Sequence, residues 1–545
     1  MTRLRFFSAL LVAAPALAAA QQLAPLPAAL PRTHTPQPTT PAITAADLMT
    51  RLYIFADDSM EGRAVGRLGN AKGTAYIAAE VRRMGLQPAG DSGTFFQNLP
   101  DFLPVVTEDA SMRVGNTTLA FPNDFLPVGT HSLKNKALAV VYGGPLGAPM
   151  TLTPAQTAGK LVVFSGPAPF VNDSFKMREQ LPQVPGAAAI AVVTLDSVTT
   201  AHRATIRYRS LHMRPQPDGP VVLLSTAGAK QLFGKELDGL PVGTAGKPVA
   251  IAYTFVSSAR NVVAILPGSD PVLRHEYVAI GAHNDHLGRR LAAAGDHDSL
   301  RVFTHFASTG GAETGGQDAT ATPEEMDSIK ANLAVLRRLH PPRPDSIYNG
   351  ADDDGSGSVS VLEIAEHLAA MPVKPKRSIL FVWHTGEEAG LLGSTYFTEH
   401  PTIPRDSIVG QLNIDMIGRG DASDIAGGGP NYIQVIGSRR LSTELGDLVD
   451  RVNKEGHHDF VFDYVTGEQY YTRSDHYMYA RFGIPIAFFF TGVHPDYHQV
   501  TDEPEYIDYP KMARIASLIS DIAVHVADLD HRLIVDHAKD AAPSN

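Results

Sequence analysis

The chain has 545 residues, enough for roughly two to four domains of about 150 residues each, and its 44% of hydrophobic against 19% of charged residues excludes a disordered chain. Its 46 Lys and Arg against 57 Asp and Glu give a net charge of −11 without a basic block, so we expect no nucleic-acid partner. The absence of cysteine excludes thiol nucleophiles, disulfides and cysteine-ligated metals, so any metal must be held by His, Asp or Glu.

Residues 1–20 have the pattern of a secretory signal peptide. Two cations lie within the first five residues, and the apolar stretch that follows closes with small residues and is too short to span a bilayer. A buried N-terminal helix is the alternative interpretation. Because no other stretch reaches the roughly 18 apolar residues of a membrane helix, we expect a periplasmic or extracellular protein without a membrane segment in its mature form.

Residues 21–42 are dense in proline and lack apolar periodicity, which predicts a flexible linker. The main domain is expected to begin over residues 43–100, where Thr44 and Asp47 fit the start of a helix. Residues 536–545 are expected to form a flexible tail.

Residues 101–254 are expected to form a small β-rich domain inserted into the main domain. From residue 137 onwards this segment alternates short β-branched runs with turns. An ordinary α/β lobe is the alternative interpretation.

The main domain is expected to continue over residues 255–535, where apolar runs alternate with amphipathic helical segments. This alternation predicts an α/β fold with a mostly parallel central sheet flanked by helices. The expected strands are 276–282, 377–383, 408–414 and 484–490, and the expected helices include 359–370 and 511–529.

An irregular stretch from 288 to 344 reads as an insertion into this domain. It is rich in glycine, alanine and acidic residues, and only residues 323–339 have apolar positions at helical spacing. We therefore expect one ordered helix within it.

Acidic residues and histidines follow each of the four expected strands. Ligands of open α/β sheets bind beyond the carboxyl ends of the strands, so these side chains are expected to lie close together. Taken singly, each fits a helix cap, a solvated turn or a surface position. However, a buried run such as 412–416 accepts a carboxylate only if it is paired or binds a cation. The residues are His283 and Asp285, Glu387 and Glu388, Asp415, Tyr497 and His498, together with Asp352 to Asp354 in a glycine-rich turn.

The short sequence segments around these residues, taken together, resemble those of the co-catalytic di-zinc exopeptidases, peptidase family twenty-eight of clan MH. That family includes aminopeptidase Y, the secreted bacterial leucyl aminopeptidases and the glutamate carboxypeptidases. The resemblance extends from about residue 43 to about residue 528, and residues 158–190 resemble the protease-associated domain often inserted into secreted peptidases. The matching strings are Gly281–Asp285, Asn349–Gly357, Thr385–Ser394, Asn413–Gly418 and Tyr497–His498.

The resemblance implies two Zn²⁺ ions per chain. His283 and Asp415 would hold one ion, Glu388 and His498 the other, and Asp353, the middle acid of three, would bridge both. Three carboxylates and two neutral imidazoles give −3 against the +4 of the ions, and one hydroxide balances the remaining +1.

The resemblance also assigns roles to residues beside the ligands. Adjacent side chains of an extended segment diverge, so one glutamate can bind metal while the other faces the substrate. The resemblance gives the binding role to Glu388 and the general-base role to Glu387. Asp285 would orient the imidazole of His283, and Tyr497 would donate a hydrogen bond to the developing oxyanion or serve only in packing. The stretch Arg473–His476 resembles a family segment near the substrate pocket.

These features predict a secreted zinc aminopeptidase that hydrolyses N-terminal residues of peptides. The alternatives are a carboxypeptidase or dipeptidase on the same fold, a glutaminyl cyclase-like transferase, and a non-catalytic receptor-like scaffold. His283 and Asp353 are separated by 353 − 283 = 70 positions, more than compact family members need, and the insertion accounts for the excess. The insertion would form a lid, restrict substrate length or have no role.

Overall fold

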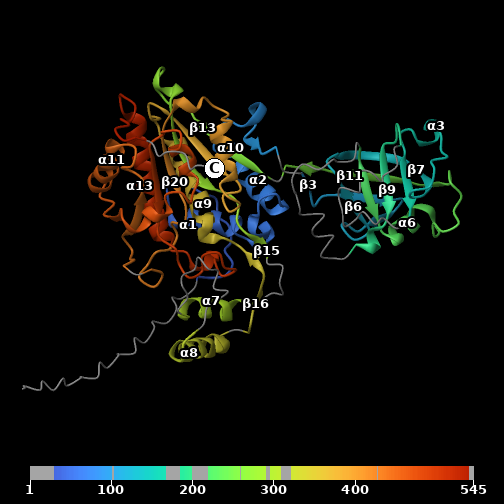
Figure 1. Ribbon diagram of the computed structural model, residues 1–545, viewed down its shortest axis with the longest axis horizontal. Helices are drawn as coiled ribbons and strands as arrows, with labels where there is room; N and C mark the ends of the chain where they lie inside the picture. The colour runs from blue at the N-terminus through green and yellow to red at the C-terminus, as the bar shows by residue number, and fades with distance from the viewer. Residues whose placement is uncertain are drawn as a thin grey trace, which may run out of the picture.

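The computed structural model describes residues 30–100, 104–166, 184–198, 219–257, 259–289, 295–307, 321–339, 341–425 and 427–538. The predicted leader at 1–20 and most of the predicted tail lie outside these residues. Over the described ranges, none of the helices combines the length and the apolar character needed to cross a membrane. Figure 1 shows two bodies, each built around its own sheet.

The larger sheet has nine strands, and its four central strands are parallel. The order is β1-β13-β19-β14-β20-β23-β21-β22, with β2 paired to β13. β19, β14, β20 and β23 run parallel, whereas β13 and β21 are antiparallel to their neighbours β19 and β23. This arrangement confirms the predicted fold class. The bounds are β1 Gln87–Pro88, β2 Phe96–Asn98, β13 Arg260–Leu266, β14 Tyr277–His283, β19 Ser378–His384, β20 Ile408–Ile414, β21 Tyr432–Ile436, β22 Val461–Asp463 and β23 Ile486–Phe490.

Helices cover both faces of this sheet. In β19, Phe381 and Trp383 pack in a core shared with α9 and α13, whereas Leu380 and Val382 pack in a core shared with α10 and α12. Burial on both faces explains why the strands are continuous apolar runs. The helices of this body are α1 Ala45–Phe55, α2 Leu68–Arg83, α9 Gly357–Ala370, α10 Leu392–Glu399, α11 Thr443–Glu455, α12 His476–Ala480 and α13 Tyr509–Asp528.

The smaller body holds an eight-stranded mixed sheet in the order β5-β4-β11-β7-β8-β9-β10-β6. It has its own apolar core, and β7 to β10 are parallel to one another. The β-rich character predicted for this segment is present, while the domain boundaries and the protease-associated resemblance stay predictions. The bounds are β4 Ser111–Val114, β5 Thr117–Leu119, β6 Phe125–Val128, β7 Leu133–Pro145, α3 Pro154–Thr157, β8 Leu161–Ser165, β9 Ala189–Val193, β10 Val221–Leu224, α6 Thr226–Phe233 and β11 Ala245–Tyr253. A separate pair joins β3 Val105–Val106 to β12 Phe255–Val256.

The stretch 288–344 contains more regular structure than the sequence predicted. α8, Pro323–Leu339, lies where a helix was expected, but α7, His297–Phe306, was not anticipated. Its apolar face is short: Val302, Phe303 and Phe306 pack with α8, while Arg301 and Asp298 of the same helix are buried as well. Two short ladders join the stretch to the body: β15 Gly288–Arg289 with β18 Ile347–Tyr348, and β16 Gly295–Asp296 with β17 Pro344–Asp345.

Residues 30–42 lie against the main body, which differs from the flexible linker expected for them. The Thr39 hydroxyl donates to Glu366 Oε2 at 2.7 Å, and His34 Nε2 lies 3.0 Å from Thr50 Oγ1. Proline-dense composition removes regular secondary structure, but it does not prevent polar groups from finding partners on a neighbouring helix.

A buried arginine ties together the helices that support one face of the larger sheet. Arg51 of α1 is fully buried; its Nε donates to Glu363 Oε2 at 2.8 Å and its Nη1 to Glu80 Oε2 at 2.6 Å, and it also pairs with Glu366. Glu363 and Glu366 belong to α9, so the cluster fixes the helix that begins at the acidic turn.

We predict that Arg51→Met lowers the free energy of unfolding by about 3–5 kcal/mol, because it leaves buried carboxylates without their partner. The matched control Arg439→Met removes an arginine whose side chain is 40% exposed and pairs with Asp447 and Asp450, and it should cost less than about 1 kcal/mol. Urea unfolding of both variants measures the difference. Equal small losses would show that the buried cluster contributes no more than a surface ion pair.

Candidate metal centre

The parallel strands deliver their following residues to one edge of the larger sheet. β14 ends at His283, β20 is followed by Asp415, and β19 is followed by Glu387 and Glu388. β23 leads into residues 491–503, which we call the His498 loop. Because carboxyl ends of parallel strands lie on the same side, side chains far apart in sequence meet there.

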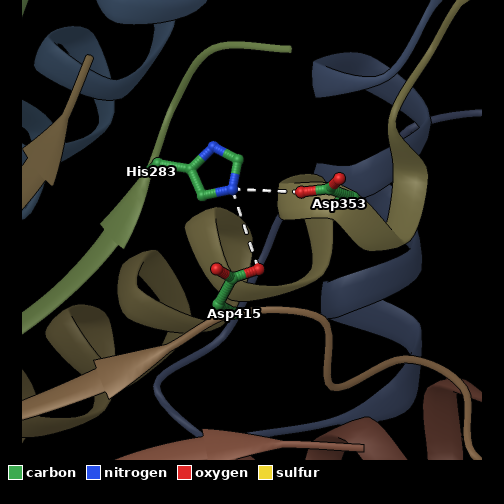
Figure 2. A group of neighbouring side chains, drawn as sticks. All are labelled: His283, Asp353 and Asp415. Carbon is green, nitrogen blue, oxygen red and sulfur yellow. Dashed lines mark ion pairs between the residues drawn. The ribbon is translucent and has the colours of Figure 1, made fainter. Parts of the chain in front are cut away.

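Asp353 lies at the centre of this group. Its Oδ1 lies 3.1 Å from His283 Nε2, and its Oδ2 lies 3.1 Å from His498 Nε2. Figure 2 shows His283 also facing Asp415, whose Oδ1 is 3.7 Å from the same ring nitrogen. On the other side, His498 Nε2 is 3.0 Å from Glu388 Oε2. The five side chains that the sequence singled out as ligands therefore converge around one carboxylate.

Backbone contacts explain why only the middle acid of the run 352–354 faces this centre. Asp354 Oδ2 accepts a hydrogen bond from His283 N at 3.0 Å, and Asp352 Oδ1 accepts one from Gly418 N at 2.6 Å. Both flanking carboxylates are thereby used to connect the turn to the strand ends. Asp353 keeps both of its oxygens directed at imidazoles.

The donor atoms are spaced as ligands of a small cation. Zinc bonds of about 2.0–2.2 Å in a tetrahedral site separate neighbouring donors by roughly 3.3–3.6 Å. The 3.0 to 3.7 Å separations around Asp353 bracket that spacing. His283 Nε2 is buried without a well-formed hydrogen bond, although it points between two carboxylates. Imidazole and carboxylate donors fit Zn²⁺, and they also suit Mn²⁺ and Co²⁺.

The concentration of buried carboxylates draws positive charge to the site. Burial would raise the pKa of Asp353, but its contacts with His283 and His498 outweigh burial and lower the pKa well below its usual range. For the His498 imidazole, burial by itself would lower the pKa. The contacts with Asp353 and Glu388 outweigh burial and raise the pKa of His498 to about 10. The site is thus built for bound cationic charge.

Two further residues hold the candidate ligands: His286, which the sequence did not single out, and Ser474, from the stretch Arg473–His476 to which the sequence gave no contacts. His286 Nδ1 lies 2.5 Å from Glu388 Oε1, and the Ser474 hydroxyl donates to Asp415 Oδ2 at 2.7 Å. His286 follows His283 by three residues in the same strand-end loop, which was the available signal. Gly350 makes room for it, because a Cβ there would lie 2.5 Å from the imidazole.

Asp285 acts differently from the expectation. His283 Nδ1 lies 3.1 Å from the backbone oxygen of Asp285, while the nearer carboxylate oxygen is 3.8 Å away. That oxygen instead accepts hydrogen bonds from Gly386 N at 2.7 Å and Glu387 N at 3.1 Å. The backbone of Asp285 therefore orients the imidazole, and its side chain holds the backbone that carries Glu387.

The two residues expected to take part in chemistry line a pocket beside the cluster. Glu387 lines it together with Asp353 and Asp415, so the adjacent glutamates diverge as expected. Tyr497 also lines it, and its ring stacks on His498 with 3.8 Å between centroids. The Tyr497 hydroxyl lies 3.5 Å from Arg473 Nη2.

The stretch Arg473–His476 contributes to the site through several side chains. Besides Ser474, it provides Asp475, whose Oδ2 lies 3.4 Å from His384 Nδ1 at the end of β19. His476 stacks on Phe488 with 4.6 Å between ring centroids. Only Arg473 and Ser474 of this stretch line the pocket.

Outside this cluster, the side chains of His297, Asp345 and Glu503 also have donor atoms within 4.8 Å of one another. His297 Nδ1 is 2.7 Å from Asp345 Oδ2, and its Nε2 is 3.1 Å from the Tyr506 hydroxyl. Glu503 Oε2 accepts from Asn349 Nδ2 at 3.2 Å. These partners make the group a hydrogen-bonded junction between the insertion and the main body.

Comparison with known proteins places the cluster in a family. Residues 261–523 match the model of Peptidase family M28, a segment that contains all five candidate ligands, Glu387 and Tyr497. This part of the chain belongs to peptidase family M28.

Curated relatives match over part of their length. Leupeptin-inactivating enzyme 1 of Streptomyces exfoliatus is 30% identical over 177 residues, covering 31% of this chain and 36% of that enzyme. A probable leucine aminopeptidase of Trichophyton verrucosum (strain HKI 0517) is 28% identical over 213 residues, covering 38% of this chain and 56% of that protein. A solved structure of a zinc aminopeptidase from Bacillus subtilis aligns with 89% of this chain and 95% of its own, at 16% identity and a TM-score of 0.41.

We predict that Asp285→Ala lowers the unfolding free energy of the metal-free protein by about 1–3 kcal/mol, because two backbone N–H groups lose their acceptor. Asp285→Asn keeps an acceptor oxygen and should lose clearly less. Urea unfolding in the presence of a chelator measures both variants without a contribution from metal binding. Equal losses would mean that the carboxylate does not hold the Glu387 backbone.

Proposed function

We propose that the chain is a zinc-dependent aminopeptidase that removes N-terminal residues from peptides. The observation that carries the proposal is the placement of Asp353 between two imidazoles, each of which faces one further carboxylate. Membership of peptidase family M28 and relatives named as leucine aminopeptidases support the same activity.

Two zinc ions per chain fit the donor set. His283 and Asp415 would hold one ion and Glu388 and His498 the other, with one oxygen of Asp353 directed at each. The three carboxylates carry −3 against +4, so the loaded site stays close to neutral. When bound, the ions supply Lewis-acid stabilisation of the negative charge that develops on the scissile carbonyl oxygen.

Glu387 would serve as the proton carrier. It faces the pocket, whereas Glu388 faces the two imidazoles. Its backbone is held by Asp285, so its carboxylate has a defined starting position. From there it would take a proton from the attacking water and return it to the leaving amine. Tyr497, beside His498, would donate to the developing oxyanion.

The pocket supports an N-terminal residue with an apolar side chain. Beside the candidate ligands the pocket lining is largely apolar and aromatic, which suits an apolar side chain of the substrate. The apolar and aromatic residues of the pocket are Met416, Tyr470, Phe488, Phe490 and Val493.

The remaining parts of the chain would serve export and access. Residues 1–20 are proposed to direct the protein to the periplasm or the exterior. The β-rich segment within 101–254 contains none of the candidate ligands, so we assign it to substrate access and not to chemistry.

We predict that the purified protein hydrolyses leucine p-nitroanilide, does not hydrolyse the N-acetylated analogue, and loses activity on chelation. The free amine is required because acetylation removes the lone pair with which an α-amine would bind at the metal site. The same panel contains an N-blocked peptide with a free C-terminus and a peptide with N-terminal glutamine. Cleavage of the former would indicate a carboxypeptidase, cyclisation of the latter a transferase, and no turnover at full metal content a non-catalytic scaffold.

We predict that Glu387→Ala keeps two zinc ions per chain but lowers kcat by roughly 10² to 10⁴-fold, since it removes the group that moves protons. Glu388→Ala instead lowers zinc content, because it removes a ligand. Elemental analysis, melting temperature and kcat are measured on both variants. Near-normal turnover of Glu387→Ala with two zinc ions would refute the assigned role, and a wild-type protein with one ion would refute the paired site.

A further inference from the structure

The buried carboxylate of Asp496, in the His498 loop, is held by two arginines and a histidine that come from two distant segments. His305 Nε2 lies 3.0 Å from Asp496 Oδ2, Arg301 Nε lies 3.5 Å away, and Arg419 Nη1 lies 3.1 Å away. Arg301 and His305 both belong to α7 of the insertion. Asp496 is fully buried, so this contact is part of the packed structure and not a surface ion pair.

The helix α7 is itself fixed to the main body at its other end. His297 contacts Asp345 and the hydroxyl of Tyr506, and the guanidinium of Arg301 lies 3.6 Å from the centroid of the Tyr506 ring. α7 also packs against α8 through Val302, and Figure 1 shows the two helices side by side beneath the larger body. These anchors argue against a lid that swings over the pocket.

Asp496 closes the turn that carries His498. Its Oδ1 accepts a hydrogen bond from the Thr501 hydroxyl at 2.7 Å, and its backbone oxygen accepts one from Gln499 N at 3.0 Å. Tyr497 and His498 lie inside the turn that these two contacts close. His498 has a φ of 56°, a left-handed conformation that residues other than glycine seldom adopt, so its surroundings must stabilise it.

His498 depends on this loop more than the other candidate ligands depend on theirs. Its side chain is 28% exposed, whereas the side chains of the other four are between 1% and 11% exposed. Its imidazole contacts the stacked Tyr497 ring and the two carboxylates that it faces, and all but the carboxylates belong to the same loop. The position of His498 therefore follows closely from the backbone of the turn that Asp496 closes.

We propose that the insertion helix α7 positions His498 through Asp496, which makes Arg301 and His305 positioning residues of the metal centre. The proposal rests on the two-zinc function above, and it gives the insertion between His283 and Asp353 the role of a brace. Loss of the α7 contacts loosens one metal position and leaves the His283 position unchanged.

The test uses the full chain, stripped of metal and titrated with Co²⁺, whose binding isotherm and absorption spectrum report each site. The double variant Arg301→Met with His305→Ala should weaken one of the two Co²⁺ ions by roughly 10- to 100-fold and change the spectrum of that ion. The other ion should keep its wild-type affinity. The single variant His305→Gln keeps an N–H donor for Asp496, so it should keep clearly more of the wild-type affinity than His305→Ala does.

Thr304→Ala is the matched control, because the Thr304 hydroxyl donates only to the Leu300 and Arg301 carbonyls of its own helix. It should leave both Co²⁺ affinities unchanged. If the double variant does not fold, His305→Ala alone is interpreted in the same way. A lower melting temperature of the metal-free variants with two unchanged Co²⁺ affinities would overturn the proposal while leaving the two-zinc function intact. A wild-type protein that binds one Co²⁺ would instead overturn the proposed function itself.

Discussion

The structure depends on one carboxylate shared between two imidazoles. Asp353 can face His283 and His498 at once only because the turn before α9 is held from several sides by hydrogen bonds to neighbouring acids. Buried like charges repel one another, so a cluster of this kind persists only with cations or N–H donors at each oxygen. The geometry around Asp353 follows from satisfying that requirement.

Acids of the same type perform two different tasks around this point, and backbone donors separate them. Asp352, Asp354, Asp285 and Asp502 accept hydrogen bonds from main-chain N–H groups, and they connect the strand ends into one rigid edge. Asp353, Asp415 and Glu388 face the imidazoles of the candidate centre, whereas the one close imidazole of Asp352 is that of His494, 3.2 Å from its Oδ2. A carboxylate is thus assigned to scaffold or ligand by what the surrounding backbone presents to it.

A buried carboxylate also connects the insertion to the site. Asp496 is buried, and two of the side chains that balance it come from a helix inserted between two candidate ligands in the sequence. The insertion therefore contacts the His498 loop, while the cluster at Arg51 secures α9, the helix that begins at the acidic turn. Helices from separate parts of the sequence thus support the elements that carry the candidate ligands.

The sequence by itself indicated the α/β class, the four central strands and the acids and histidines that follow them, from which the resemblance to a family selected five candidate ligands. These rest on local signals: continuous apolar runs, turn glycines, and acids or histidines directly after strands. Only the tertiary structure decided that His286 and Ser474 hold Glu388 and Asp415, and that α7 reaches Asp496. Those contacts join residues 59 to 191 positions apart, and the partner of a polar side chain at such separations is set by strand order and loop path, which composition and periodicity do not encode.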